Sequence, residues 1–285
     1  MINRGKTYWK QNYKAFSFCE YYYGDRHHYF EYQKLIAYIS NKYGVTKNNK
    51  WDLVIDFCCF DRKEAKSAIR GLGETCKLYV FISSDSVYDV CDESLRKEAL
   101  IKEEYAIRPE NQTQLKKLND EDDYGNDKLR CEEYFLSHIK DQFNYLCLRL
   151  PDVIGPFDSS GRFWGYMEWI KVSDKHPIHF NKFTPLRKLS FVFSKDVAKL
   201  LINLLLKSVE NKTEFFKSVH QQSFNISFDE NYTLLELLES IAAKMSIEVY
   251  LIYLFKLNNR KLIQLMKILL KEEPNFFIQV LIADQ

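Results

Sequence analysis

The sequence predicts an α/β fold in which helices cover a parallel β-sheet. Short runs rich in β-branched and aromatic residues alternate along the chain with segments of helical periodicity, as in parallel sheets with crossover helices. Residues 53–55 and 78–82 are apolar without interruption, which is typical of strands buried on both faces. With 285 residues, the chain is long enough to bury a sizeable core.

Four segments are expected to form the strands of this sheet. They are rich in Val, Ile, Leu, Tyr and Phe, and each has the length of an ordinary strand. In chain order they are residues 51–57, 77–83, 145–150 and 223–227.

Helical periodicity predicts the elements between and around these strands. Apolar residues recur at intervals of three and four in residues 30–42, 61–72, 125–142, 195–207 and 233–245. The charged residues 92–123 are interpreted as a surface excursion that is partly helical. The acidic run at 120–123 directly precedes a helix, where negative side chains stabilise the exposed N–H groups, so we interpret it as a capping run.

The pattern changes after residue 154. Gly155, Gly161 and Gly165 interrupt it, which predicts a first domain over residues 1–154 and a second lobe over residues 155–285. Segments near 186–227 are expected to return to the first domain. Residues 250–270 mix apolar residues with Lys and Arg; we favour a core helix, with a partner surface or a membrane-surface helix as the alternatives.

Composition limits the function classes. A net charge of +2 gives no electrostatic case for nucleic acid, so an RNA partner is not favoured. No segment approaches the roughly 20 apolar residues that span a bilayer, and the first residues lack the apolar run of a signal peptide. The seven cysteines include no Cys-x-x-Cys pair, so no metal site is predicted. We expect a cytoplasmic protein with reduced thiols.

Tyr124 and Lys128 are the residues whose spacing most clearly indicates chemistry. Positions i and i+4 lie on one face of a helix, so both side chains can reach one bound molecule. A phenol has an ordinary pKa of about 10, and a neighbouring ammonium lowers it towards the range of acid/base catalysis. Ser84 ends a predicted strand, at the sheet edge where ligands of open α/β sheets bind. Ser84 could therefore hydrogen-bond the oxygen that exchanges the proton.

Several motifs follow one another in a fixed order. Phe81-Ile-Ser-Ser-Asp-Ser-Val-Tyr88 ends a strand, Tyr124-Gly-Asn-Asp-Lys128 opens a helix, and Leu148-Arg-Leu-Pro-Asp-Val-Ile-Gly-Pro156 forms a strand and loop. Phe191-Val-Phe-Ser-Lys-Asp-Val-Ala198 and Phe224-Asn-Ile-Ser227 come later. Together they resemble the extended short-chain dehydrogenase/reductase family, of the NAD(P)-dependent epimerase/dehydratase type. The resemblance implies a Rossmann-like, doubly wound parallel sheet with a smaller C-terminal substrate lobe.

The resemblance also implies roles for individual residues. Tyr124 would be the general acid/base, Lys128 would hold the nicotinamide ribose, and Ser84 would orient the substrate. The positions implied for cofactor binding are Arg4, Asp25, Arg26, Cys58, Cys59, Lys128 and Pro151, and those implied for substrate binding are Asp85, Ser86 and Arg187. Arg4 would suit a 2′-phosphate, so the resemblance favours NADP over NAD.

The sequence departs from the family at its start. None of the nine glycines forms the Gly-x-x-Gly-x-x-Gly turn that lets a backbone approach a pyrophosphate. Residues 2–5 instead resemble the end of the family's second strand, so by resemblance the chain is truncated and lacks the first strand, the glycine loop and the first helix. We therefore expect weak NADP binding.

Two function classes stay open at this point, and a non-functional fragment, inactive because of the truncation, is a third reading. The first is an NAD(P)-dependent oxidoreductase that transfers a hydride on a hydroxyl or carbonyl substrate such as a nucleotide sugar. The second is a non-catalytic binding or regulatory protein of the same fold, with RNA as one candidate ligand. Relatives in the family dimerise through the helix that carries the Tyr-x3-Lys pair, so the resemblance also implies a homodimer through residues 129–142.

Overall fold

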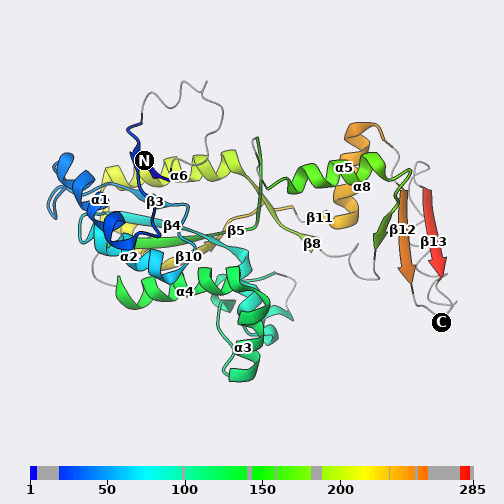
Figure 1. The fold of residues 1–285 in the computed structure, drawn as a ribbon, viewed down its shortest axis with the longest axis horizontal. Helices are drawn as coiled ribbons and strands as arrows, with labels where there is room; N and C mark the ends of the chain where they lie inside the picture. The colour runs from blue at the N-terminus through cyan, green and yellow to red at the C-terminus, as the bar shows by residue number, and fades with distance from the viewer. Residues whose placement is uncertain are drawn as a thin grey trace. The chain divides into compact units, whose positions relative to one another are not determined.

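The structure is a computed structural model that describes residues 1–4, 19–97, 100–139, 143–156, 158, 160–180, 188–230, 232–247, 250–255 and 277–282. The chain divides into two compact units (Figure 1). Unit 1 comprises Met1–Pro151 and Asp196–Ile226, and unit 2 comprises Asp152–Lys195 and Ser227–Gln285.

Unit 1 is built on a four-stranded parallel sheet. Its strands are β3 (Val54–Asp56), β4 (Leu78–Ser84), β5 (Asn144–Leu150) and β10 (Gln222–Asn225), in the order β10-β5-β4-β3. Neighbouring strands are parallel throughout. All seven residues of β4 are buried, as expected for a central strand covered on both faces. The predicted α/β class with a parallel sheet is confirmed.

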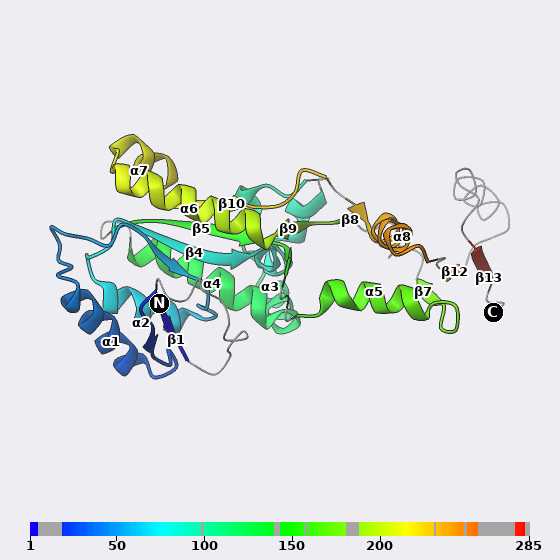
Figure 2. The same cartoon turned by 90° about the horizontal axis from the view of Figure 1, so that it is seen from above.

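Helices cover both faces of this sheet. Figure 2 shows α6 (Ser194–Glu210) and α7 (Thr213–Val219) on one face and α2 (Arg62–Leu72) and α4 (Asp123–His138) on the other. The core beneath α2 and α4 is rich in aromatic side chains: the rings of Tyr79 and Phe81 each pack edge-on against the Phe135 ring. Such offset aromatic packing fixes α4 on the sheet.

The helix starts follow from local chemistry. The side chain of Asp61 accepts a hydrogen bond from Glu64 N at the start of α2, and α1 (Tyr29–Lys42) packs against α2. Asp122 caps α4 by accepting from Gly125 N at 3.0 Å and Asp123 lies in its first turn, so the interpretation of the acidic run at 120–123 as a capping run is confirmed for these two residues. Asp120 and Glu121 instead end the preceding helix, Gln112–Glu121.

A second, smaller sheet in unit 1 pairs β1 (Ile2–Asn3) with β2 (Tyr22–Tyr23) in parallel. Directly after β2, Arg26 forms a buried ion pair with Asp56 at the end of β3, at 2.6 and 2.8 Å. This ion pair joins the two-stranded sheet to the carboxyl end of the main one.

The charged excursion between β4 and α4 is partly helical, as predicted. It contains the 3-10 helices η2 (Asp85–Val90), η3 (Glu93–Lys97) and η4 (Glu103–Tyr105) and the helix α3 (Gln112–Glu121). The Asn111 side chain caps α3 by accepting from two backbone N–H groups. Leu118 of α3 packs with Leu129 of α4 in a satellite core.

Unit 2 combines short strands with two helices. The helices are α5 (Arg162–Val172) and α8 (Leu234–Met245), and their apolar sides share one core that includes Ile170 and Leu238. The strands are β6 (Asp152–Ile154), β7 (Ile178–Phe180), β8 (Lys188–Leu189), β9 (Phe191–Phe193), β11 (Tyr232–Thr233), β12 (Tyr250–Phe255) and β13 (Phe277–Ile282).

The prediction of a core helix from residue 250 is wrong for the residues that the structure describes. Tyr250–Phe255 is strand β12, which pairs in parallel with both β7 and β13. A six-residue apolar segment suits either a buried strand or a buried helix, and periodicity alone does not separate the two. The rest of that prediction, residues 256–270, lies outside the described residues.

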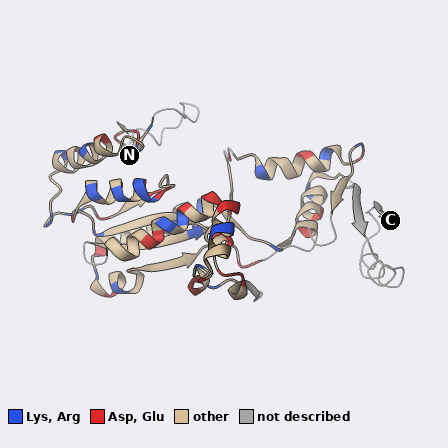
Figure 3. Ribbon diagram, turned by 60° about the horizontal axis from the view of Figure 1, so that its bottom comes forward, with Lys and Arg blue, Asp and Glu red and all other residues tan. Residues whose placement is uncertain are grey.

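Charges are mixed along the helices. Figure 3 shows Lys and Arg interspersed with Asp and Glu on the helices of each unit. Among the described residues, no helix is both long enough and apolar enough to cross a membrane.

Candidate active site

The site begins where β4 ends. Ser83 and Ser84 are the last residues of this buried strand, and their side chains have different partners. Ser83 Oγ donates to Glu132 of α4 at 2.6 Å, whereas Ser84 Oγ lies 3.2 Å from Ser86 Oγ and 3.3 Å from Asp85 Oδ1. Ser84 Oγ also accepts from Ser86 N and so caps η2. Ser84, Asp85 and Ser86 therefore form one polar cluster at the carboxyl edge of the sheet.

The first turn of α4 lies directly against this cluster. A β-carbon on Gly125 would fall 2.3 Å from the Ser86 carbonyl oxygen, so only glycine allows this approach. Because Tyr124 directly precedes Gly125, the same contact places the start of α4 beside the Ser84 cluster. The glycine between the two predicted site residues was part of the motif, but its packing role is visible only in the structure.

Tyr124 and Lys128 lie on the same side of α4, as their spacing predicts. The Lys128 Nζ atom is 5.8 Å from the centre of the Tyr124 ring, and the Phe60 ring is near both, 6.5 Å from the Tyr124 ring and 5.0 Å from Nζ. Tyr124 is 45% exposed, whereas Lys128 is only 2% exposed. A half-exposed phenol beside a buried ammonium is an arrangement that can exchange a proton with a bound molecule.

The Lys128 ammonium is bound to main-chain oxygens. Nζ donates to the carbonyls of Cys59 and Ile82, at 2.8 Å each, and lies 4.8 Å from the centre of the Phe81 ring. These contacts use two of its three N–H groups. Burial lowers the pKa of Lys128 below its ordinary value, because a desolvated ammonium loses its hydration.

A buried polar network supports α4 from behind. Glu132 forms an ion pair with Arg149 of β5 at 2.7 Å, and Arg149 donates to Tyr88 Oη at 2.7 Å. Tyr88 Oη in turn donates to Asn225 at the end of β10. Sequence reasoning did not identify Glu132 as part of the site. The sequence feature that could have identified Glu132 is its position one turn beyond Lys128, on the side of α4 that faces Arg149.

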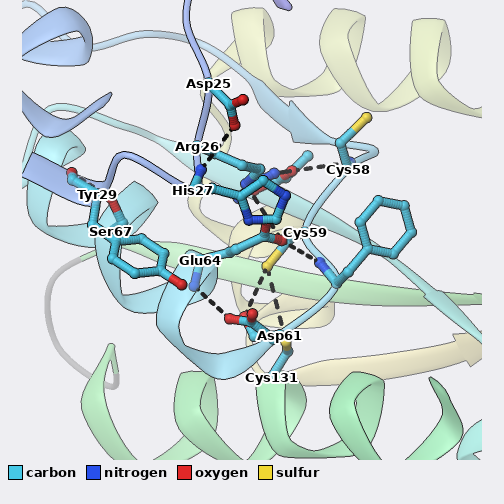
Figure 4. A network of polar contacts seen from close by, with 12 residues as sticks. Asp25, Arg26, His27, Tyr29, Cys58, Cys59, Asp61, Glu64, Ser67 and Cys131 are labelled. Atoms are coloured by element: carbon cyan, nitrogen blue, oxygen red, sulfur yellow. Dashed lines mark hydrogen bonds and ion pairs between the residues drawn. The ribbon is translucent and has the colours of Figure 1, made fainter. Parts of the chain in front are cut away.

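Arg26, predicted to bind a cofactor, is engaged within the protein. Its two terminal nitrogens donate to both oxygens of Asp56, and its Nε lies 3.6 Å from Glu64 (Figure 4). Burial disfavours the charged carboxyl of Asp56, but the bonds from Arg26 and Tyr79 outweigh burial and lower its pKa. The Arg26 guanidinium thus has charged partners within the protein, and its role in cofactor binding stays a prediction.

The other predicted cofactor residues occupy the same edge of unit 1. Asp25 follows β2 and accepts from His27 N at 3.1 Å, and Arg4 follows β1 with an exposed side chain. Cys58 and Cys59 follow β3; the Cys58 side chain is exposed and the Cys59 side chain is buried. Within the part of the chain that the structure describes, the cysteines are free thiols, and no cluster of His, Cys, Asp and Glu could hold a metal ion.

Pro151 directly follows β5, where the first segment of unit 1 ends. Arg187, predicted to bind substrate, lies outside the described residues. Within unit 1, the start of α4, which carries Tyr124, packs against Ser86 in the turn that follows Ser84, and Lys128 binds the carbonyl of Cys59 in the β3–α2 loop.

The polar and aromatic groups along this edge fit the parts of a nicotinamide dinucleotide. An exposed guanidinium suits a phosphate, a carboxylate suits ribose hydroxyls or an adenine amine, and exposed aromatic rings suit a planar heterocycle. Arg4 and Asp25 supply the first two, and the half-exposed rings of Phe57 and Phe60 supply the third.

Comparisons with known proteins agree with this architecture. The sequence model of the NAD dependent epimerase/dehydratase family matches residues 67–226. A search of curated proteins finds no match.

Solved structures show the same fold at low sequence identity. The dTDP-glucose 4,6-dehydratase of Bacillus anthracis str. Ames, in complex with NAD, superposes with a TM-score of 0.54 at 12% identity, over 95% of this chain and 71% of that one. The UDP-glucose 4-epimerase of Thermus thermophilus, in complex with NAD, gives a TM-score of 0.57 at 15% identity, over 88% and 76%. The enzyme WbmG of Bordetella bronchiseptica, in complex with NAD and UDP, gives 0.56 at 12% identity, over 88% and 71%.

Proposed function

Because the chain belongs to the NAD-dependent epimerase/dehydratase family, we propose that it is an NAD(P)-dependent oxidoreductase of the epimerase/dehydratase type. The reaction is hydride transfer at a carbon that carries a hydroxyl or carbonyl group. One observation carries the proposal: Gly125 packs against Ser86, so the helix with Tyr124 and Lys128 starts beside Ser84 at the carboxyl edge of the sheet.

In this proposal Tyr124 moves the proton. As a phenolate, its half-exposed side chain takes the proton from a substrate hydroxyl during oxidation, and as the resulting phenol it returns a proton to the carbonyl oxygen during reduction. The Lys128 ammonium, 5.8 Å from the Tyr124 ring, stabilises the negative charge of the phenolate, which is present before the proton is taken up and again after it is returned. Ser84 Oγ holds the reacting oxygen by a hydrogen bond, in exchange for its present contacts with Asp85 and Ser86.

A nicotinamide nucleotide supplies or accepts the hydride when it is bound. Lys128 would hold its ribose with the remaining N–H group, the exposed edge at Cys58 would contact the nicotinamide end, and Asp25 would contact the adenosine. Arg4 would bind a 2′-phosphate, which favours NADP over NAD.

A nucleotide sugar is the proposed substrate class. Its support is indirect: two of the solved relatives are named as enzymes of dTDP-glucose and UDP-glucose, and a third holds UDP. In this proposal the first domain, residues 1–154 with the returning segment near 186–227, binds the cofactor. The second lobe, residues 155–285, is the proposed sugar-nucleotide-binding part, and Asp85 and Ser86 are the substrate-binding residues proposed within the first domain.

A non-catalytic protein of the same fold is the second candidate. The observation that favours it is the enclosure of Lys128, which is 2% exposed and whose ammonium is already bonded to two carbonyls. Such a lysine can serve packing alone. This candidate predicts ligand binding without turnover.

Titration calorimetry with NAD⁺ and NADP⁺ tests the proposal, with turnover measured afterwards on UDP- and dTDP-hexoses. We expect saturable binding, weaker for NAD⁺ than for NADP⁺, and a selective loss of NADP⁺ affinity in Arg4→Ala. The exposed Arg62 of α2 gives the matched control Arg62→Ala, which should bind both nucleotides as the wild type does. If neither nucleotide binds at millimolar concentration, the oxidoreductase proposal fails.

A further inference from the structure

Two thiols from different elements face each other in the core of unit 1. Cys59 lies in the loop between β3 and α2, and Cys131 lies on α4, one turn beyond Lys128. Their sulfur atoms are 3.9 Å apart and share a hydrogen bond (Figure 4). A disulfide needs a sulfur–sulfur distance of about 2.0 Å, so the pair closes with a relative movement of roughly 2 Å.

Both thiols are buried, but the loop that carries Cys59 lies at the surface. Cys59 and Cys131 are each 0% exposed, whereas the neighbouring residues Cys58 and Phe60 are exposed. The sulfur atom of Cys59 thus lies in the core, while the residues on either side of it in the sequence face solvent. Cys59 Sγ contacts the Asp61 carbonyl oxygen at 3.7 Å as well as the Cys131 sulfur.

We propose that Cys59 and Cys131 are a redox modification site, at which a peroxide converts the two thiols into an intramolecular disulfide. One thiol attacks hydrogen peroxide and becomes a sulfenic acid, with release of one water. The other thiol then attacks that sulfur, the S–S bond forms and a second water leaves. The two thiols together lose two electrons and two protons, and one hydrogen peroxide is reduced to two waters.

The environment makes this oxidation slow and selective. The hydrogen bond with Cys131 and burial raise the pKa of Cys59 well above its ordinary value, so the reactive thiolate is scarce at neutral pH. The first step consequently waits for the surface loop to open. Once one sulfur is a sulfenic acid, its partner is already in contact, so closure to the disulfide competes well with further oxidation.

A disulfide between Cys59 and Cys131 would link the β3–α2 loop to α4, which a hydrogen bond from Lys128 already connects. The Cys59 carbonyl accepts from Lys128 Nζ, and Cys131 lies on the same helix as Lys128. A disulfide would add a covalent link between the β3–α2 loop and α4. Oxidation would thereby restrain the loop that borders Tyr124, whatever ligand the site binds.

Peptide mapping after peroxide treatment tests the proposal. Trypsin releases residues 51–62 with Cys58 and Cys59 and residues 131–140 with Cys131. We expect these two peptides to be joined under non-reducing conditions, with the protein mass lowered by about 2 Da for the two hydrogens lost, and a reducing agent to reverse both changes. This readout is independent of nucleotide binding and of turnover.

Cysteine variants identify which two sulfur atoms form the disulfide. Cys131→Ser and Cys59→Ser should each abolish the joined peptide, with Cys131→Ala and Cys59→Ala as replacements if either serine variant does not fold. Cys58→Ser should keep it. Cys76→Ser is the matched control, because Cys76 is equally buried but its thiol donates to the Leu78 carbonyl. The proposal is wrong if Cys58→Ser removes the link, or if peroxide oxidises these thiols to sulfinic acids without joining the peptides.

Discussion

Gly125 lies so close to Ser86 that a β-carbon on Gly125 would fall 2.3 Å from the Ser86 carbonyl oxygen. This close approach fixes where α4 begins relative to the end of β4. The position of Tyr124, and of Lys128 one turn later, depends on it. The structure thus links one glycine to the placement of the whole candidate site.

Replacing Gly125 by alanine should lower stability. The added methyl group meets backbone, which cannot move aside as a flexible side chain could, and overpacking of this kind costs about 1–3 kcal/mol. Urea unfolding of Gly125→Ala measures the loss. The control is Gly165→Ala in α5, where nothing lies within 4 Å of the added carbon and alanine favours the helix. Equal stability of the two variants would show that the Ser86 contact is not restrictive.

Replacing Tyr124 by phenylalanine should abolish turnover and leave nucleotide affinity unchanged. The ring stays beside Phe60 while the group that moves the proton is lost, and a positioned acid/base contributes roughly 10²–10⁴-fold in rate. Steady-state kinetics and calorimetry on the same preparation separate the two effects. Tyr38→Phe removes a phenol from an exposed position of α1 and should behave as the wild type. Turnover in Tyr124→Phe at the wild-type rate would remove Tyr124 as the acid/base.

The contribution of Lys128 to stability should rise with pH. Burial lowers its pKa in the folded chain below the ordinary value of 10.5, so between the folded-state pKa and 10.5 the unfolded chain binds the extra proton. The penalty for burying the charge is present below the folded-state pKa and disappears as the pH rises from there towards 10.5. The free energy of unfolding of the wild type minus that of Lys128→Met should therefore increase over this interval. Urea titrations of both proteins at several pH values measure it; a constant or falling difference contradicts the assignment.

Replacing Asp56 by asparagine should be strongly destabilising. It removes the carboxylate that both terminal nitrogens of the buried Arg26 bind and leaves only Glu64, 3.6 Å from Nε, and loss of one member of a buried ion pair costs about 3–5 kcal/mol. Glu168→Gln, which breaks the exposed ion pair with Lys171, should change stability little. Denaturant unfolding compares the two variants.

The loss of stability caused by Asp56→Asn should also depend on pH. Despite its burial, the bonds from Arg26 hold the pKa of Asp56 below its ordinary value, so the stability it contributes is present above that value and is lost as the pH falls through the folded-state pKa. The wild type and Asp56→Asn should therefore converge in strong acid. A gap that stayed constant down to the lowest pH would show that Asp56 is not the titrating group.

The main sheet of unit 1 was predictable because its signals are local. A strand such as β4 is apolar along nearly its whole length, and the helix α4 has both an acidic cap and regular periodicity. The predicted strand at residues 51–57 is shorter in the structure, since only Val54–Asp56 forms a ladder and Trp51 makes an isolated bridge to Cys76.

The remaining features depend on contacts between distant residues. Strand β12 pairs with β7 and β13, and nothing in its six apolar residues reveals those partners. Similarly, the spacing of Tyr124 and Lys128 follows from the helical repeat, but the acceptors of the Lys128 ammonium are carbonyls of the β3–α2 loop and of β4. The pairing of Arg26 with Asp56 was likewise not predictable from the sequence, because it connects a residue that follows a strand of one sheet with the last residue of a strand in another.

The hydrogen bonds from Lys128 to two carbonyl oxygens fix the orientation of α4 about its own axis. One residue of slippage turns a helix by about 100°, which would carry the ammonium away from both acceptors and leave a charge stranded in the interior. The direction of the Tyr124 side chain is consequently set by this orientation of α4, because rotating the helix costs free energy. A ligand therefore has to fit the helix in this orientation.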